Sequence, residues 1–507
     1  LLGFSLMEEK DFKQAKTYLA KAIEKKDSLA QNALYHLGIC CIETNDKSNA
    51  KAMFKEASEM DFDMTIKEKA LLNYAKVACE TSSAYNEPLK AFQTFTEQFP
   101  TSDKANEAKE YLAQLYGEMK NYRDAIEMIE QMSERNLSVN KAYQRLCLNR
   151  AIELFNENRT DDALIYLDKS LSQTHDNSLT AAAYYLKAEA YHQMGEYELS
   201  IKNLNTFYSV PGADKSQFVS QADYAMGYNL FRQKKYSIAK GYFQRAIGKI
   251  RKEQSDDACL RYADCLYMCR EFSAAISEYD KIIAQQLQDA DYACYQTAMA
   301  SGALGNYAKK KEILQNAIKK YDGSNYIASM KYELANTYLT LEENKSAIQT
   351  YQSIIDAHPQ SIHTRDCYAK IGMIYYKLGE DKKALVYLDK LVKTYPESKE
   401  ARLALANIKA IYVEANKVDE IISYTSTIPN AKISVGEQDS ISFQAAENLY
   451  MEGNYKNAMS GFKQYLAKYP DGAFSVTANY SLVDCLSRDN QKQEAISCYE
   501  KVISNRK

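Results

Sequence analysis

The segment KSAIQTYQSIIDAHPQS, from Lys345 to Ser361, is one copy of a pattern that recurs along the chain. Stepping from its small residue, Ala347, to the equivalent residue of each similar segment gives fourteen anchor positions about 37 residues apart. A chain of 507 residues is too long for a single core, so we predict one continuous repeat array over residues 1–507. The anchors are residues 15, 50, 88, 125, 163, 200, 239, 275, 310, 347, 384, 420, 458 and 495.

Three aligned columns describe each copy. The anchor is Ala in ten of the fourteen copies, and the residue twelve positions earlier is Gly or Ala in eleven. The residue four positions after the anchor is large and apolar or aromatic in all fourteen, as at Tyr351 and Leu388. Small residues let two facing helices approach closely, and the large residue one turn later fills the space beside them. Each copy is therefore predicted to be a helix–turn–helix hairpin.

The punctuation of the sequence supports this prediction. Glycine at Gly195, Gly379 and Gly453 falls where the first helix of a copy should end, and it suits a left-handed C-cap. Endings such as YPES, Tyr395 to Ser398, stop the second helix with proline and supply a serine to cap the next helix. The whole chain has only 17 Gly and 7 Pro, which favours an all-α fold.

These columns resemble those of the tetratricopeptide repeat (TPR) family over essentially residues 1–507. The resemblance implies a right-handed superhelical solenoid, with copies about three residues longer than the family's usual length of about 34. The small residues are lost at Lys76 and Pro88, at Lys310, and at Ile408 and Glu420. We therefore expect weaker packing near residues 76–100 and 400–435.

Charge and hydropathy exclude several classes of protein. The net charge of −3 provides no broad positive field, so no nucleic-acid partner is expected. No run of 18 apolar residues occurs, so no direct membrane span is expected. The chain starts at Leu1 inside a predicted helix, which suggests a fragment of a longer protein.

The long copies with YPES-like endings are similar to TPR proteins of bacterial envelopes, including the lipoprotein of the outer-membrane β-barrel assembly machine. This similarity favours a periplasmic or outer-membrane-associated location in a bacterium over a cytoplasmic one. The eleven cysteines point the other way, because unpaired thiols are at risk in an oxidising compartment.

The sequence contains no phosphate-binding glycine loop, zinc-protease motif or nucleophile turn, and its five histidines are scattered. We therefore predict no enzymatic activity, no cofactor and no metal, with the cysteines acting as small core residues. Two alternatives remain open. The chain is the regulatory or substrate-recruiting segment of a larger enzyme, or Cys259, Cys265 and Cys269 form a thiol-based metal site.

The 42 tyrosines are the most informative surplus in the composition. Many lie three residues before or four residues after the first small residue of a copy, two columns that share one stripe of the first helix. The TPR resemblance implies that this stripe lines a concave groove for protein or peptide partners. We call this set the tyrosine stripe: Tyr185, Tyr224, Phe231, Tyr267, Tyr295, Tyr332, Tyr376, Tyr412, Phe443 and Tyr450.

We predict a non-catalytic scaffold or adaptor that binds partner segments along this groove. The similarity to envelope proteins suggests that it acts in a cell-envelope assembly. Four members of the stripe, Tyr224, Phe231, Tyr267 and Tyr295, are expected to form a contiguous exposed patch. TPR proteins that grip a chaperone's acidic C-terminus use Lys, Asn and Arg at these positions, so no such carboxylate clamp is expected here. The alternative is that the rings pack between neighbouring first helices.

Overall fold

The computed structural model describes residues 1–82, 84–429 and 431–504. Within these ranges the regular elements are twenty-eight α-helices and one short 3-10 helix, and no strand is present. The all-α prediction is confirmed. None of the helices in these ranges is both long enough and apolar enough to cross a bilayer.

The odd-numbered helices, here called first helices, carry the first of the two small-residue columns. Their bounds are α1 (Leu2–Glu8), α3 (Ser28–Glu43), α5 (Met64–Thr81), α7 (Ala105–Glu118), α9 (Leu137–Asn156), α11 (Asn177–Gln193), α13 (Val219–Arg232), α15 (Lys252–Met268), α17 (Ala290–Ala303), α19 (Ile327–Thr340), α21 (Thr364–Lys377), α23 (Lys399–Glu414), α25 (Val435–Met451) and α27 (Ser475–Arg488).

The even-numbered helices, here called second helices, carry the anchor residues. Their bounds are α2 (Phe12–Ala20), α4 (Lys47–Ser58), α6 (Asn86–Gln98), α8 (Tyr122–Glu130), α10 (Thr160–Leu171), α12 (Tyr197–Ser209), α14 (Tyr236–Ala246), α16 (Phe272–Ala284), α18 (Tyr307–Lys320), α20 (Asn344–Ala357), α22 (Asp381–Thr394), α24 (Val418–Ser426), α26 (Tyr455–Lys468) and α28 (Lys492–Ser504). The 3-10 helix η1 (Ala213–Lys215) follows α12.

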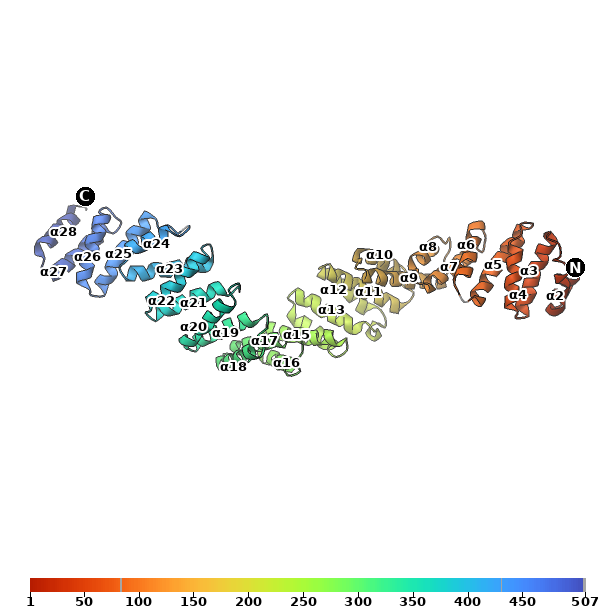
Figure 1. Ribbon diagram of the computed structural model, residues 1–507, viewed down its shortest axis with the longest axis horizontal. Helices are drawn as coiled ribbons and strands as arrows, with labels where there is room; N and C mark the ends of the chain where they lie inside the picture. Colours follow the sequence, from red (N-terminus) through yellow and green to blue (C-terminus); the bar gives the residue numbers. More distant parts are fainter. Residues whose placement is uncertain (83, 430, 505–507) are drawn as a thin grey trace. The chain divides into compact units, whose positions relative to one another are not determined.

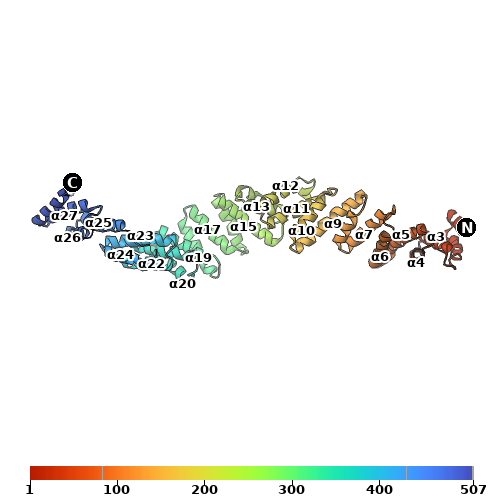
Figure 2. The same cartoon turned by 90° about the horizontal axis from the view of Figure 1, so that it is seen from above.

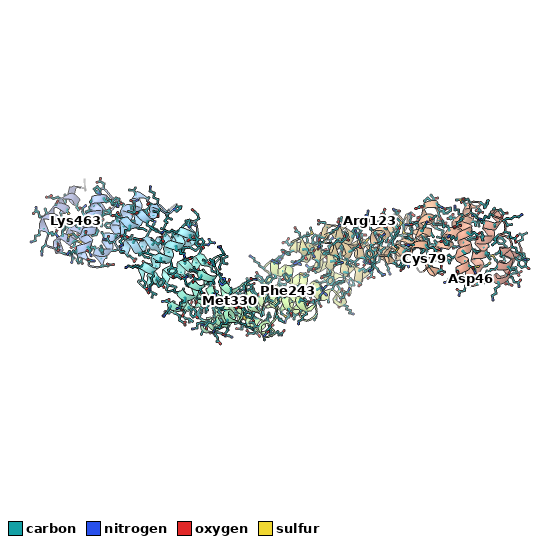
Figure 3. All side chains as sticks on the ribbon, viewed as in Figure 1. Asp46, Cys79, Arg123, Phe243, Met330 and Lys463 are labelled. Atoms are coloured by element: carbon teal, nitrogen blue, oxygen red, sulfur yellow. The ribbon has the colours of Figure 1, made fainter. Side chains whose placement is uncertain are left out.

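The chain divides into two compact units, residues 1–265 and 266–507, with the boundary inside α15. Consecutive helices pack on one another from α1 to α14 in the first unit and from α16 to α28 in the second, an order that both views of the ribbon follow (Figure 1, Figure 2). Phe243 on α14 marks the first unit and Met330 on α19 marks the second (Figure 3). Both side chains are fully buried.

The small and large columns meet as predicted in the four hairpins that have glycine in the small column, at Gly3, Gly38, Gly227 and Gly372. A Cβ atom on Gly38 would lie 2.6 Å from the Phe54 ring, and one on Gly372 would lie 2.5 Å from Cδ2 of Leu388. Such distances leave no room for any side chain larger than hydrogen. The glycines are therefore required by the close approach of the first helix to the large residue of the second.

Most turns inside the hairpins contain one residue with positive φ, five positions before the anchor. Glycine occupies this position at Gly195, Gly379 and Gly453, with φ between 72° and 80°, as predicted for a left-handed C-cap. Elsewhere other residues adopt the same conformation, including Asn416 with a φ of 55°. The residue five positions after Asn416 is Ile421, which is fully buried, whereas Glu420 is exposed. The anchor of that copy is thus one residue later than the spacing predicted.

The copy with Lys310 as its anchor keeps a closed core by a different route. Lys310 is 7% exposed, and its Nζ lies 2.6 Å from Oε2 of Glu333 on α19. Gly302 makes room for the lysine, because a Cβ there would lie 2.8 Å from Cδ of Lys310. The lost alanine is compensated by a glycine on the partner helix and by an ion pair with the next hairpin.

The region of residues 76–100 is held by a polar network around Glu87. Its Oε1 accepts a hydrogen bond of 3.0 Å from the Tyr74 hydroxyl, and its Oε2 accepts one of 2.5 Å from the Ser82 hydroxyl. Lys51 on α4 also donates to Oε2 at 3.0 Å. One carboxylate therefore joins α4, α5 and α6 where the small-residue columns are interrupted.

This network predicts a pH-dependent stability. The hydrogen bonds from Ser82 and Lys51 lower the pKa of Glu87 from 4.5 to about 2. A carboxylate with a depressed folded-state pKa stabilises the fold above about pH 4.5 and loses that contribution as the pH falls towards 2. Glu87→Gln should therefore lower the melting temperature at pH 6, and its deficit against the wild type should disappear near pH 2. Thermal unfolding followed by circular dichroism tests this, with the exposed Glu56→Gln as control; a deficit unchanged between pH 6 and pH 2 would contradict it.

Candidate partner-binding groove

The tyrosine stripe lies on successive first helices, and its members are half-buried, with Phe443 buried at 5% exposure. This corrects the expectation of an exposed patch at Tyr224, Phe231, Tyr267 and Tyr295, because none of these four rings stands free in solvent. The first two belong to the first unit and the last two to the second. The contacts that hold each of these rings lie within its own unit.

Two tyrosines three residues before the small column donate to an aspartate on the next first helix. The Tyr224 hydroxyl on α13 donates to Oδ2 of Asp257 on α15 at 2.8 Å. Tyr332 on α19 makes the same contact with Asp366 on α21. Burial and the neighbouring carboxylates raise the pKa of both phenols, so each remains a neutral donor at physiological pH.

Two tyrosines of the other column, four residues after the small residue, also reach the next first helix. The Tyr376 hydroxyl donates to Oε1 of Glu414 at 2.7 Å, and the Tyr450 hydroxyl donates to Oδ2 of Asp484 at 2.9 Å. The hydrogen bond to Glu414 raises the pKa of Tyr376 to about 12. Both columns of the stripe thus link consecutive hairpins.

The rings of four stripe residues stack on a ring at the start of the next first helix. Tyr332 lies 4.3 Å from His363 between ring centroids, and Phe443 lies 4.8 Å from Phe474. Each partner ring belongs to the N-cap residue of its helix. The other two stacked pairs are Tyr185 with Phe218 at 5.1 Å and Tyr295 with Tyr326 at 6.2 Å. Stacked aromatic pairs add stability beyond the area they bury.

The remaining three stripe members contact second helices of their own hairpins. Phe231 meets Tyr236 edge to face at 5.2 Å, and Tyr267 meets Phe272 in the same way at 5.4 Å. Tyr412 is stacked with Tyr424 at 6.5 Å. The inter-repeat packing that the sequence left as an alternative is therefore what most of the stripe does.

Family comparison decides the identity of the repeat. Models of the tetratricopeptide repeat match seven segments spread over the chain: residues 31–64, 181–210, 292–324, 329–361, 366–398, 441–472 and 476–507. The chain is a tetratricopeptide repeat protein. No curated protein matches the sequence.

Several solved structures resemble parts of this TPR protein. The C-terminal part of a TPR repeat-containing protein from Cytophaga hutchinsonii is 21% identical, covers 51% of this chain and 99% of its own, and superposes with a TM-score of 0.42. YrrB, described as a TPR protein with an unusual peptide-binding site, is 21% identical over 39% of this chain and 91% of its own, with a TM-score of 0.32. The MamA protein is 19% identical over 35% and 91%, with a TM-score of 0.30.

The stacked pairs of the TPR protein have a signal in the sequence. The partner rings follow the stripe residues by 31 to 33 positions and stand directly before a first helix, as in the segments PQSIH and PDGAF. This aromatic column before each first helix indicates that the stripe rings pack between hairpins.

The alternative metal site finds no support in the TPR array. In the described ranges, no three His, Cys, Asp or Glu side chains lie close enough together to hold a metal ion. Cys265 is fully buried within the core. Burial also raises the pKa of Cys147 and Cys367 to about 12 and that of Cys40 to about 11, which keeps these thiols protonated and unreactive.

Proposed function

We propose that this TPR protein is a non-catalytic scaffold that binds segments of partner proteins along the face formed by its first helices. The observation that carries the proposal is the row of aromatic rings on that face, each held by a hydrogen bond or by contact with another ring. A surface fixed before binding loses little conformational entropy when a partner docks. Aromatic rings also give large contact areas at low entropic cost.

The rings contribute to binding through the edges that remain accessible. Substituting them is a poor test, because removal of Tyr224 or Tyr332 would also break a contact between hairpins. The residue directly after the small column lies beside the stripe at 100° per residue and is often accessible. Ile152 on α9 and Met373 on α21 occupy this position, with exposures of 38% and 45%.

The second helices of the same hairpins provide matched controls. Ile165 on α10 and Val386 on α22 are exposed apolar residues at 56% and 64%. Each lies thirteen positions after its counterpart on the first helix. A photoreactive benzoylphenylalanine at these four positions therefore compares the two faces within the same hairpins.

The experiment places the photoreactive residue at each position in the full chain, irradiates the native host and identifies adducts by mass spectrometry. We expect adducts with a defined set of proteins at positions 152 and 373, and none of these at 165 and 386. Equal or stronger crosslinking from the second helices would overturn the proposal. An absence of adducts at all four positions would do so as well.

The competing function is a recruiting segment of a larger enzyme. It would use the same first-helix face, with a substrate protein as the partner. The crosslinked proteins distinguish the scaffold from the recruiting segment. A recruiting segment would capture substrate proteins that all carry the same enzymatic modification.

A further inference from the structure

The two columns of the tyrosine stripe carry rings at Tyr35 on α3 and Phe155 on α9, and the run of rings is interrupted between them. The copies that begin with α5 and α7 carry no aromatic residue in either column of the stripe. In α7 the two positions are occupied by Glu110 and Gly117. Neither column of α7 therefore supplies a ring towards the next first helix.

A cavity of about 460 Å³ lies at this place, between α7, α8 and α9. Its floor includes Ala113, Ile129 and Val139, which are 3%, 0% and 2% exposed. Gly117 forms part of its wall. Volumes in this range suit a compact organic group, and an apolar floor with a few polar groups at the rim is typical of binding pockets.

The rim of the cavity is charged and mainly acidic. Glu110 and Glu118 stand on α7, and Arg145 stands on α9. The Gln114 amide donates to Oε1 of Glu118 at 3.0 Å. In the described part of the chain, neither glutamate forms an ion pair with Arg145. Two carboxylates against one guanidinium favour a ligand with a positive charge beside its apolar part.

The column pattern indicates what fits the cavity. Elsewhere the position of Gly117 carries a tyrosine, as at Tyr376 and Tyr450, whose ring occupies the space towards the next first helix. In this copy that ring is missing while the apolar floor remains, and Tyr122 at the start of α8 lines the same cavity. An aromatic or bulky apolar side chain from outside the chain would complete the stripe.

We propose that this cavity, here called the α7–α9 pocket, binds an aromatic or bulky apolar side chain of a partner peptide that carries Lys or Arg within two residues of it. The inference rests on the proposed binding function of the first-helix face and specifies the chemistry of one subsite. The ring lies on the floor, and the neighbouring cation lies against Glu110 and Glu118.

Gly117→Tyr tests the pocket by closing it with the residue that the column carries elsewhere. A Cβ at Gly117 would lie 3.0 Å from Cδ2 of Leu146, the mobile end of a side chain, so the substitution can be accommodated. Gly241→Tyr is the matched control, because a Cβ on that residue of α14 has no neighbour within 4 Å. Circular dichroism and melting curves verify that both variants fold.

The probe is an immobilised positional-scanning library of random dodecapeptides. The wild type and Gly241→Tyr should select an aromatic or bulky apolar residue with a neighbouring Lys or Arg. Gly117→Tyr should bind the selected peptides at least about tenfold more weakly. Glu118→Lys, an exposed substitution that needs no repacking, should shift the neighbouring preference from basic to acidic residues.

The outcomes separate this inference from the proposed function. Selected peptides that bind Gly117→Tyr and the wild type equally, while crosslinking at positions 152 and 373 persists, would overturn the pocket and leave the scaffold function intact. Failure to select any peptide would also overturn the pocket. Self-association of the wild type that Gly117→Tyr abolishes in sedimentation would overturn the partner peptide in favour of a second copy of this chain.

Discussion

Ala347→Asp is expected to lower the free energy of unfolding of its hairpin by about 4 kcal/mol, because it places an unpaired carboxylate in a closed core. Ala347 on α20 is fully buried, as are Ala335 on the facing helix α19 and Tyr351 one turn later. These residues belong to one apolar cluster, and the Tyr351 hydroxyl within it already donates to Oδ1 of Asn336 at 2.6 Å. Aspartate is the smallest side chain that introduces a charge at the contact between the two helices.

The damage should stay close to the substitution, since each hairpin of a solenoid packs mainly on its neighbours. Hydrogen exchange followed by mass spectrometry should show lost protection in α19 to α21 and unchanged protection in α1 to α14. Gln349→Asp is the control, because it adds the same charge at an exposed position of the same helix. Loss of protection over the whole chain in a single step would contradict the expectation of local damage.

Gln31→Leu is the second large change, with an expected loss of about 3 kcal/mol. Gln31 is fully buried on α3, and its Nε2 donates to the carbonyl oxygens of Met60 and Asp63 at 2.7 Å and 3.1 Å. Its Oε1 accepts from the Asp63 backbone N–H at 2.7 Å. Leucine keeps the volume but leaves these backbone groups unsatisfied inside the protein.

The same arrangement occurs at Gln144, three copies later. Its Nε2 donates to the Asp176 carbonyl oxygen at 3.1 Å, and its Oε1 accepts from the Asp176 N–H at 3.0 Å. Gln144→Leu should therefore cost a similar amount in its own hairpin. Urea unfolding measures both losses, with the exposed Gln14→Leu as control. A loss no larger than that of the control would show that the backbone groups find other partners.

The three sequence columns were sufficient for the fold because they describe contacts inside one hairpin. Gly38 against Phe54 and Gly372 against Leu388 are separated by 16 residues, a spacing that varies little from copy to copy. The anchor column was wrong by one residue in one copy. The spacing predicts Glu420 as the anchor, whereas the buried residue is Ile421.

The role of the tyrosine stripe could not be obtained from those columns. The partners of most of its members lie on the next hairpin, about 31 to 38 residues away, and they are of several kinds, such as Asp257, Glu414 and Phe474. A spacing that crosses a loop of variable length gives a weak periodic signal. The α7–α9 pocket could not be predicted for a related reason. A missing ring in a sequence column indicates a pocket only when the packing of the neighbouring helices around that position is known.

The stacked rings also have a mechanical consequence. Each pair fixes the separation of two successive first helices, and bending the array at that point would require the rings to slide apart. The segment α11 to α13 is braced in this way by Tyr185 and Phe218, whereas α5 and α7 carry no ring in either stripe column. Because Phe92 and Tyr111 stack between α6 and α7, we expect the first unit to bend more easily between α7 and α9, at the α7–α9 pocket, than between α11 and α13.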